Sequence, residues 1–226
     1  PNPNDCGLSL GQMLTEYPNQ INEVVYNGFE ILDKDNLINI VEQRGAKKID
    51  SKAIVDLLRE GKILGLVSGN SEVGPRALGN RSIICDPSFL DMKDTLNKKV
   101  KFREWYRPFA PVCLLEDAND YFIDAFESNY MSYAPIVKDK YRENLPSITH
   151  EDGTARLQTV TKNQHFVFWS ILNEMKNRAG IPVILNTSFN IKGLPILTSI
   201  EDALYVLDNT EMDYVVVEDY IFEAKK

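Results

Sequence analysis

Segments with helical periodicity alternate with short apolar segments along most of this chain, and this alternation limits the fold more than any other feature of its 226 residues. Such an order favours an α/β (α+β) fold, in which helices flank a twisted mixed sheet. We predict helices over 6–17, 36–44, 51–61, 88–98 and 163–180, with a last helix opening at Ser199. Strands are predicted near 24–29, 62–69, 81–85, 109–115, 133–138, 154–160 and 182–185, and in "YVVVED".

Two helices carry end signals in the sequence. Ser51 stands where helix 51–61 begins and Gly61 where it ends, so we predict Ser51 as the N-cap. Ser199 and Asp202 have the spacing of a capping box at the start of the last helix. These signals predict where helix 51–61 and the last helix begin.

The charge and hydropathy of the chain argue against two classes of protein. Its net charge of −8 argues against a general nucleic-acid binder, which has a basic footprint. One basic segment, "KKVKFREWYR" (98–107), still allows a basic cleft on an acidic surface. No apolar run is long enough to predict a membrane span.

The cysteines and the start of the chain bear on its location. Three widely spaced cysteines (Cys6, Cys85, Cys113) fit reduced thiols and predict a cytoplasmic protein. The start, "PNPNDCGLSL", has neither the basic nor the apolar region of a signal peptide. It also lacks an initiator Met, and we therefore expect this chain to be part of a longer one.

Two polar segments follow predicted strands, where ligands tend to bind in α/β folds. The first, "SEVGPRALGNRSIICDP", holds Arg76 and Arg81 among glycines, and arginine suits phosphate or carboxylate oxygens. An alternative is that both arginines pair with Glu72 and Asp86. The second, "NTSFN" (186–190), offers amides and hydroxyls to a nucleotide, or satisfies its own turn.

Four segments in order carry a family resemblance: "GPRALGNRS", "KFREWYRPFAP", "THEDGTARLQTV" and "LNTSFNIKG". They resemble the C-terminal region of the O-carbamoyltransferases of the nodulation-protein and antibiotic-carbamoylation type, over about residues 50 to 220. The resemblance implies a YrdC-like fold with a basic concave face. It also implies an enzyme that takes ATP, Mg²⁺ and carbamoyl phosphate to carbamoyl-adenylate.

In that family a separate N-terminal domain of the actin-like ATPase superfold passes the carbamoyl group to a hydroxyl of a small-molecule acceptor. By resemblance, residues 1–20 are a remnant of that domain, 21–48 a linker or edge segment, and 49–226 the YrdC-like domain. Asp5 matches an aspartate that, with two upstream histidines, holds an iron-type or other divalent metal; alternatively it caps helix 6–17. One carboxylate cannot hold such a metal, so we expect no complete site in this chain.

The resemblance also assigns site residues. We expect Arg76, Lys101, Arg103 and His150 to be catalytic, with His150 either moving protons or holding a turn. ATP and carbamoyl phosphate together bring about six negative charges into one cleft, which requires several fixed cations. The residues expected to bind ATP, its phosphates or Mg²⁺ are Arg81, Arg107, Thr154, Arg156, Asn186, Ser188 and Asn190.

Two other functions fit the same sequence. A YrdC-like module can present a basic face to RNA, although the net charge of −8 makes a nucleic-acid partner a poor fit. The chain can also bind nucleotide without turnover of its own, since the acceptor domain is mostly absent from it. Cys85 and Cys113 lie in apolar segments and are expected to be packing residues, as is Phe109.

Overall fold

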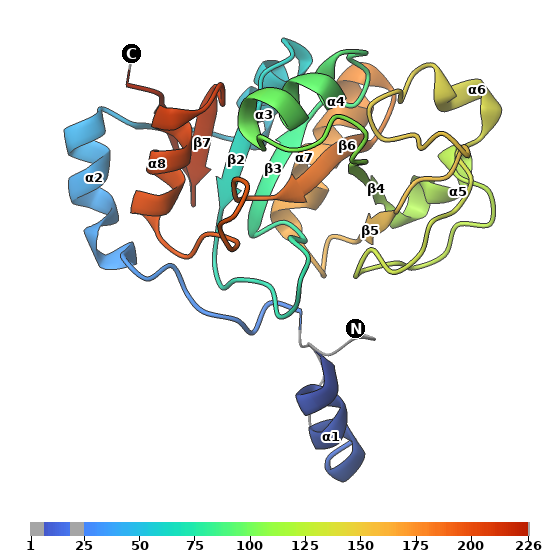
Figure 1. Cartoon of the computed structure of the whole chain (residues 1–226), viewed down its shortest axis with the longest axis horizontal. Coiled ribbons are helices and arrows are strands. Elements are labelled where there is room, and N and C mark those ends of the chain that lie inside the picture. The colour runs from blue at the N-terminus through green and yellow to red at the C-terminus, as the bar shows by residue number, and fades with distance from the viewer. Residues whose placement is uncertain (1–6, 19–24, 226) are drawn as a thin grey trace.

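An eight-stranded mixed sheet forms the centre of the protein in the computed structural model, which describes residues 7–18 and 25–225 (Figure 1). Its strand order is β1-β8-β7-β2-β3-β6-β4-β5. The pairs β2–β7 and β4–β5 are parallel and the other neighbours are antiparallel. The strands are β1 Lys47–Lys48, β2 Leu64–Val67, β3 Arg81–Cys85, β4 Ala110–Leu114, β5 Gln158–Val160, β6 Val183–Ser188, β7 Tyr214–Val217 and β8 Tyr220–Glu223.

Helices cover both faces of this sheet, as the sequence predicts. Strand side chains alternate between the faces, so Ile83 and Cys85 of β3 point into one core and Ile84 into the other. Helices α3 and α7 cover the Ile84 face, whereas α2, α4 and α8 contribute to the core on the Ile83 face. The helices are α1 Leu8–Glu16, α2 Leu37–Arg44, α3 Ser51–Arg59, α4 Met92–Thr95, α5 Ala118–Tyr121, α6 Asp139–Arg142, α7 Phe166–Ala179 and α8 Ile200–Asn209.

The first helix stands apart from the rest of the described chain. Helix α1 has no buried residue, and it projects away from the sheet and its flanking helices (Figure 1). Leu8 and Met13 of this helix are exposed. Asp5 lies outside the described residues. No helix in the described part of the chain is both long and apolar enough to cross a membrane.

The helix ends follow local hydrogen bonding. At α8 the Ser199 hydroxyl accepts from the Asp202 N–H while the Asp202 carboxylate accepts from the Ser199 N–H, which confirms the predicted capping box. The predicted N-cap of α3 is wrong by one residue. Asp50 has the extended backbone of a cap and its carboxylate accepts from Ala53 N–H, whereas Ser51 is already helical.

Three predicted strands differ from the structure. Of the strand predicted near 24–29, residue 24 lies outside the described residues; residues 25–29 form no strand, and the carbonyls of Val25 and Phe29 accept hydrogen bonds from the 71–73 loop. Residues 133–138 make only isolated bridges: Tyr133 and Ile136 to Leu157 and Thr154, and Val137 to Phe122. Strand β6 is longer than predicted and runs through Ser188, so the first part of "NTSFN" lies in the sheet.

Candidate functional site

A small polar pocket brings together residues from distant segments of the chain. Its volume is about 80 Å³, and three arginines line it: Arg76 from the β2–β3 loop, Arg103 from the segment before β4, and Arg156 from the segment before β5. Strand β6 supplies Asn186, Thr187 and Ser188, and these lie beside the arginines in the lining. We call it the arginine pocket.

The positive charges of this pocket repel one another. Burial, followed by the charges of the neighbouring Arg107 and Arg156, lowers the pKa of Arg103 to about 10. Burial also lowers the pKa of Arg156, followed by the charge of Arg76. No carboxylate is among the residues that line the pocket. Clustered cations without an acidic partner are the arrangement expected of an anion-binding site.

Two polar atoms near the cluster lack partners. Asn186 is buried, and its Nδ2 donates to the Ala77 carbonyl (3.0 Å) and to Gln158 Oε1 (3.0 Å). Within the described residues, Asn186 Oδ1 and Arg156 Nε form no hydrogen bond although both are buried. Buried polar atoms are nearly always paired, so a ligand or water that offers a donor and an acceptor would complete this arrangement.

The loop that carries Arg76 is fixed from several sides. Glu72 Oε1 accepts from the backbone N–H groups of Leu78 (2.7 Å) and Asn80 (2.8 Å). On the other side Gln158 Nε2 donates to the Leu78 carbonyl at 2.8 Å. From the sequence alone, Glu72 is a possible ion-pair partner of an arginine, and Gln158 has no assigned role. In the sequence, the signal for this contact is a carboxylate, Glu72, shortly before the Gly-Pro pair of the loop.

Arg81 corrects the sequence prediction. Its side chain is fully buried, and its guanidinium donates to the carbonyls of Ser68 (2.8 Å), Asn80 (2.8 Å) and Gly69 (3.0 Å). Arg81 and Ile83 are two residues apart in β3 and therefore lie on the same face of the sheet. Asn186 of β6 is paired with Ile84 and lies on the opposite face. Arg81 therefore holds the β2–β3 loop together and is not offered to a phosphate. The alternative ion pair is also absent, since Asp86 pairs with Arg59 (2.6 Å).

Lys101 lies next to the arginine pocket and does not line it. Its Nζ donates to the Ser188 carbonyl (2.7 Å), the Asn190 carbonyl (2.7 Å) and Asn190 Oδ1 (2.6 Å). The Ser188 hydroxyl also donates to Asn190 Oδ1 at 2.7 Å. Burial lowers the pKa of Lys101 to about 7, with a smaller effect from Arg103. This buried lysine thus fixes the end of β6 where Ser188 enters the pocket.

The remaining predicted site residues lie outside the lining. Arg107 is exposed and donates to Glu104 Oε2 at 3.1 Å. His150 Nδ1 lies 3.0 Å from Thr154 Oγ1, and Thr154 Oγ1 donates to Asp152 Oδ1 at 2.7 Å. Burial lowers the pKa of His150, more than Asp152 raises it. His150 and Thr154 therefore form a hydrogen-bonded turn beside Arg156.

No metal site is evident in the part of the chain that the structure describes, where no group of three or more His, Cys, Asp and Glu side chains has a metal-binding arrangement. Cys85 and Cys113 are free and fully buried, and burial raises the pKa of both thiols well above the usual value. Both cysteines are thus packing residues, as predicted. Phe109 is also buried, and the Arg103 guanidinium lies over its ring, 4.6 Å from the centroid.

Solved structures similar to this chain include HypF from T. kodakarensis, with a TM-score of 0.49, 16% identity and coverage of 74% of this chain and 22% of that chain. Full-length HypF in a phosphate- and nucleotide-bound form has a TM-score of 0.46 and 15% identity, and the match covers 76% of this chain and 24% of that one.

Curated relatives share more of the sequence. Nodulation protein NolNO of Sinorhizobium fredii is 44% identical over 171 residues, which cover 74% of this chain and 25% of that protein. Nodulation protein NolO of Bradyrhizobium diazoefficiens is 41% identical over 178 residues, 77% of this chain and 32% of that protein. The chain therefore spans about a quarter to a third of the length of these two relatives.

A family model identifies the family of the chain. The model described as "Carbamoyltransferase C-terminus" matches residues 55–224. This range holds all four quoted motifs and all the residues that line the arginine pocket. On this match, which covers most of the sequence, the chain belongs to the carbamoyltransferase C-terminal family.

Proposed function

We propose that this chain is the part of an O-carbamoyltransferase that binds ATP and carbamoyl phosphate and forms carbamoyl-adenylate. A separate part of the enzyme would then transfer the carbamoyl group to a hydroxyl of a small-molecule acceptor. The observation that carries the proposal is the convergence of Arg76, Arg103 and Arg156 on one pocket whose lining holds no carboxylate. The family match and the nodulation-protein relatives agree with it.

The arginine pocket suits one phosphate group rather than a whole nucleotide, because its volume is only about 80 Å³. Three guanidinium groups can grip phosphate oxygens with paired hydrogen bonds and stay charged at neutral pH. A carbamoyl group carries an amide, whose N–H suits the unpartnered Asn186 Oδ1. We therefore assign phosphate binding to Arg76, Arg103 and Arg156, and carbamoyl binding to Asn186.

The proposed chemistry balances with ATP, carbamoyl phosphate and water. Hydrolysis of carbamoyl phosphate releases inorganic phosphate and leaves carbamate. A carbamate oxygen then attacks the α-phosphorus of ATP, the bond to the β-phosphate oxygen breaks, and pyrophosphate leaves. Arginines fixed around the phosphate align the reacting groups and stabilise the charge that develops on the phosphoryl oxygens. Lys101 acts on this site by holding the Ser188 end of β6.

Magnesium fits this pocket only as an ion carried on the nucleotide. It would screen the charges between phosphates when bound. The lining offers the amide of Asn186 and the hydroxyls of Thr187 and Ser188, but no carboxylate for Mg²⁺ to prefer. An iron-type metal belongs, in this proposal, to the separate acceptor domain. The free thiols Cys85 and Cys113 and the use of ATP fit a cytoplasmic enzyme.

Carbamoyl-phosphate-dependent release of pyrophosphate from ATP tests this function. We expect Arg76→Ala to lower the rate about tenfold or more, because a charged hydrogen bond contributes roughly 1.5–3 kcal/mol. The control is Lys52→Ala, which removes an exposed cation outside the pocket lining and should leave the rate unchanged. An Arg76→Ala protein that stays folded and releases pyrophosphate at the normal rate would show the assignment to be wrong. Calorimetry with a non-hydrolysable ATP analogue separates binding by this chain from turnover.

A further inference from the structure

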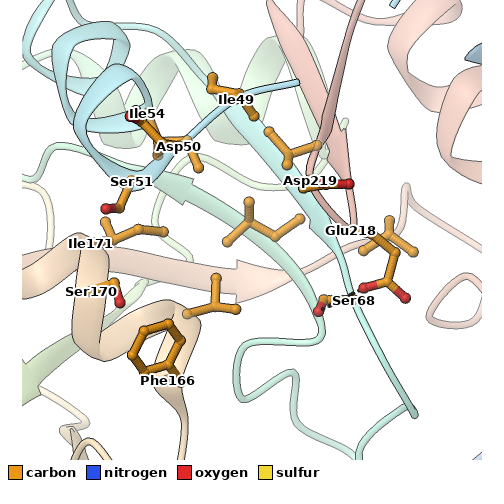
Figure 2. Close-up of a pocket in the computed structure, with 14 residues that line it drawn as sticks. Ile49, Asp50, Ser51, Ile54, Ser68, Phe166, Ser170, Ile171, Glu218 and Asp219 are labelled. Atoms are coloured by element: carbon orange, nitrogen blue, oxygen red, sulfur yellow. Dashed lines mark hydrogen bonds between the residues drawn. The ribbon is translucent and has the colours of Figure 1, made fainter. Parts of the chain in front are cut away.

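A second and larger cavity lies on the α3/α7 side of the sheet (Figure 2). Its volume is about 370 Å³ and it shares no lining residue with the arginine pocket. The first turns of α3 and α7 form one side of it, and the end of β2 with the β7–β8 turn forms the other, as Figure 2 shows. None of the four family motifs contributes to its lining. The proposed function therefore leaves this cavity unexplained.

The interior of this cavity is apolar. Ile54 of α3, Ile171 of α7, Leu66 and Val67 of β2, and Val216 of β7 line it. An engineered apolar cavity of about 150 Å³ is enough to bind benzene, and small-molecule sites typically occupy about 300–1,000 Å³. A cavity of about 370 Å³ thus has room for a two-ring aromatic group. Phe166 stands at the rim and is 61% exposed, which leaves an aromatic face for a ligand to contact.

The charged side chains in the lining are all acidic. Asp50, Glu218 and Asp219 contribute carboxylates, and no Lys, Arg or His is among the lining residues. Asp50 uses Oδ1 to cap α3, while Asp219 pairs through Oδ2 with the exposed Lys48 at 2.7 Å. A carboxylate accepts about four hydrogen bonds, so Asp50 and Asp219 both keep acceptor capacity for a ligand.

Glu218 also lines the cavity, next to Asp219 in the β7–β8 turn. Its carboxylate accepts from Ser68 Oγ and from Gly69 N–H, both at 3.4 Å, and its backbone N–H donates to the Val67 carbonyl at 2.8 Å. Lys34 Nζ lies 3.5 Å from Glu218 Oε1, outside the lining. The β7–β8 turn is thereby tied to the end of β2, so the acidic rim has a fixed position relative to the apolar interior.

We propose that this cavity binds a small amine, with its apolar or aromatic part against Ile54, Ile171 and Val216 and its ammonium group at Asp50 and Asp219. The charged side chains that an anion of the same shape would meet there are all carboxylates, whereas those that line the arginine pocket are all cations. The two pockets are thus complementary in charge: one takes phosphate and the other an organic cation. This second site is independent of the carbamoyl chemistry.

Three indole compounds of similar size test the charge and the shape of the site together. Tryptamine is a cation, tryptophol is neutral and indole-3-acetate is an anion. In ¹H–¹⁵N NMR titrations we expect tryptamine to shift the amides of 50–54, 166–171 and 216–219, and to bind more tightly than tryptophol, with indole-3-acetate weakest. Asp219→Asn should reduce the preference for tryptamine over tryptophol about threefold, the size of an exposed ion pair.

A matched pair of substitutions on α7 locates the site. Ser170→Trp should fill the cavity and abolish binding, whereas Asn177→Trp, exposed on the same helix and outside the lining, should leave binding intact. The proposal is wrong if the three compounds bind equally, if indole-3-acetate binds best, or if tryptamine still binds the Ser170→Trp protein. Asp219→Asn lies at the rim and removes no apolar packing, so it tests the charge even if Ser170→Trp fails to fold.

Discussion

His165 Nε2 lies 2.9 Å from Asn80 Oδ1, and this contact joins the start of α7 to the loop that carries Arg76. On the same ring, Nδ1 accepts from the Phe168 N–H at 3.0 Å, so the proton must be on Nε2, which donates to Asn80. Asn80 Nδ2 in turn donates to the Asn70 carbonyl at 2.7 Å. A helix cap and a loop of the arginine pocket therefore share one buried imidazole.

Gly79 packs directly against this imidazole, and we predict that Gly79→Ala destabilises the protein. A Cβ there would lie 2.4 Å from His165 Nε2, and its φ of +136° disfavours any side chain. We expect a loss of roughly 1–3 kcal/mol in the free energy of unfolding, measured by urea titration. Gly45→Ala is the control, since Gly45 has a φ of +65° but nothing within 4 Å of an added Cβ. Equal losses in the two variants would mean that the contact with His165 is unimportant.

The buried His165 also predicts a pH dependence of stability. Burial lowers the pKa of His165 from 6.5 to about 4. Between these pH values this histidine is protonated in the unfolded chain and neutral in the folded protein. Stability should therefore fall as the pH decreases from about 6.5 to 4, by up to about 3 kcal/mol. His165→Asn keeps a capping side chain and removes the titrating group, so its unfolding free energy should fall less over this range. Parallel decreases in both proteins would contradict the prediction.

Lys101 predicts a pH dependence of anion binding at the arginine pocket, and this binding should weaken as the pH rises. Its pKa of about 7 means that it loses its charge as the pH rises through neutrality. Sulfate keeps its own charge over this range, and we expect its affinity for the protein to fall between pH 6 and 9. In Lys101→Met the sulfate affinity should be lower at pH 6 and nearly constant with pH. An unchanged pH profile in the variant would show that another group is responsible.

Arg81 should matter for stability rather than for binding. Arg81→Met removes a buried guanidinium that donates to four carbonyls, and we expect it to cost roughly 3 kcal/mol or more in the free energy of unfolding. The sulfate affinity of the fraction that remains folded should stay near that of the unmodified protein. A stable Arg81→Met protein that no longer binds sulfate would instead support the original assignment of Arg81 to phosphate.

Local patterns were enough to predict much of the fold. The apolar repeat in 163–180 predicts α7, and the capping box of Ser199 and Asp202 predicts where α8 begins. Both predictions rest on interactions between residues three or four apart, and such local pairs can be recognised directly in the sequence. The strand predicted near 24–29 fails because its backbone pairs with the 71–73 loop, a partner far away in the chain.

The sequence alone also identified the family and, through its motifs, the residues that meet in the arginine pocket: Arg76, Arg103, Arg156, Asn186 and Ser188. Only the tertiary structure separated Arg76 from Arg81. The two arginines belong to one motif, but Arg81 opens β3, where the two-residue period of the strand turns it to the face opposite Asn186. Lys101 likewise became a brace for β6 because folding surrounds it with four oxygens of Ser188 and Asn190. Residue type sets what chemistry a side chain can perform, whereas strand register and burial decide what it faces.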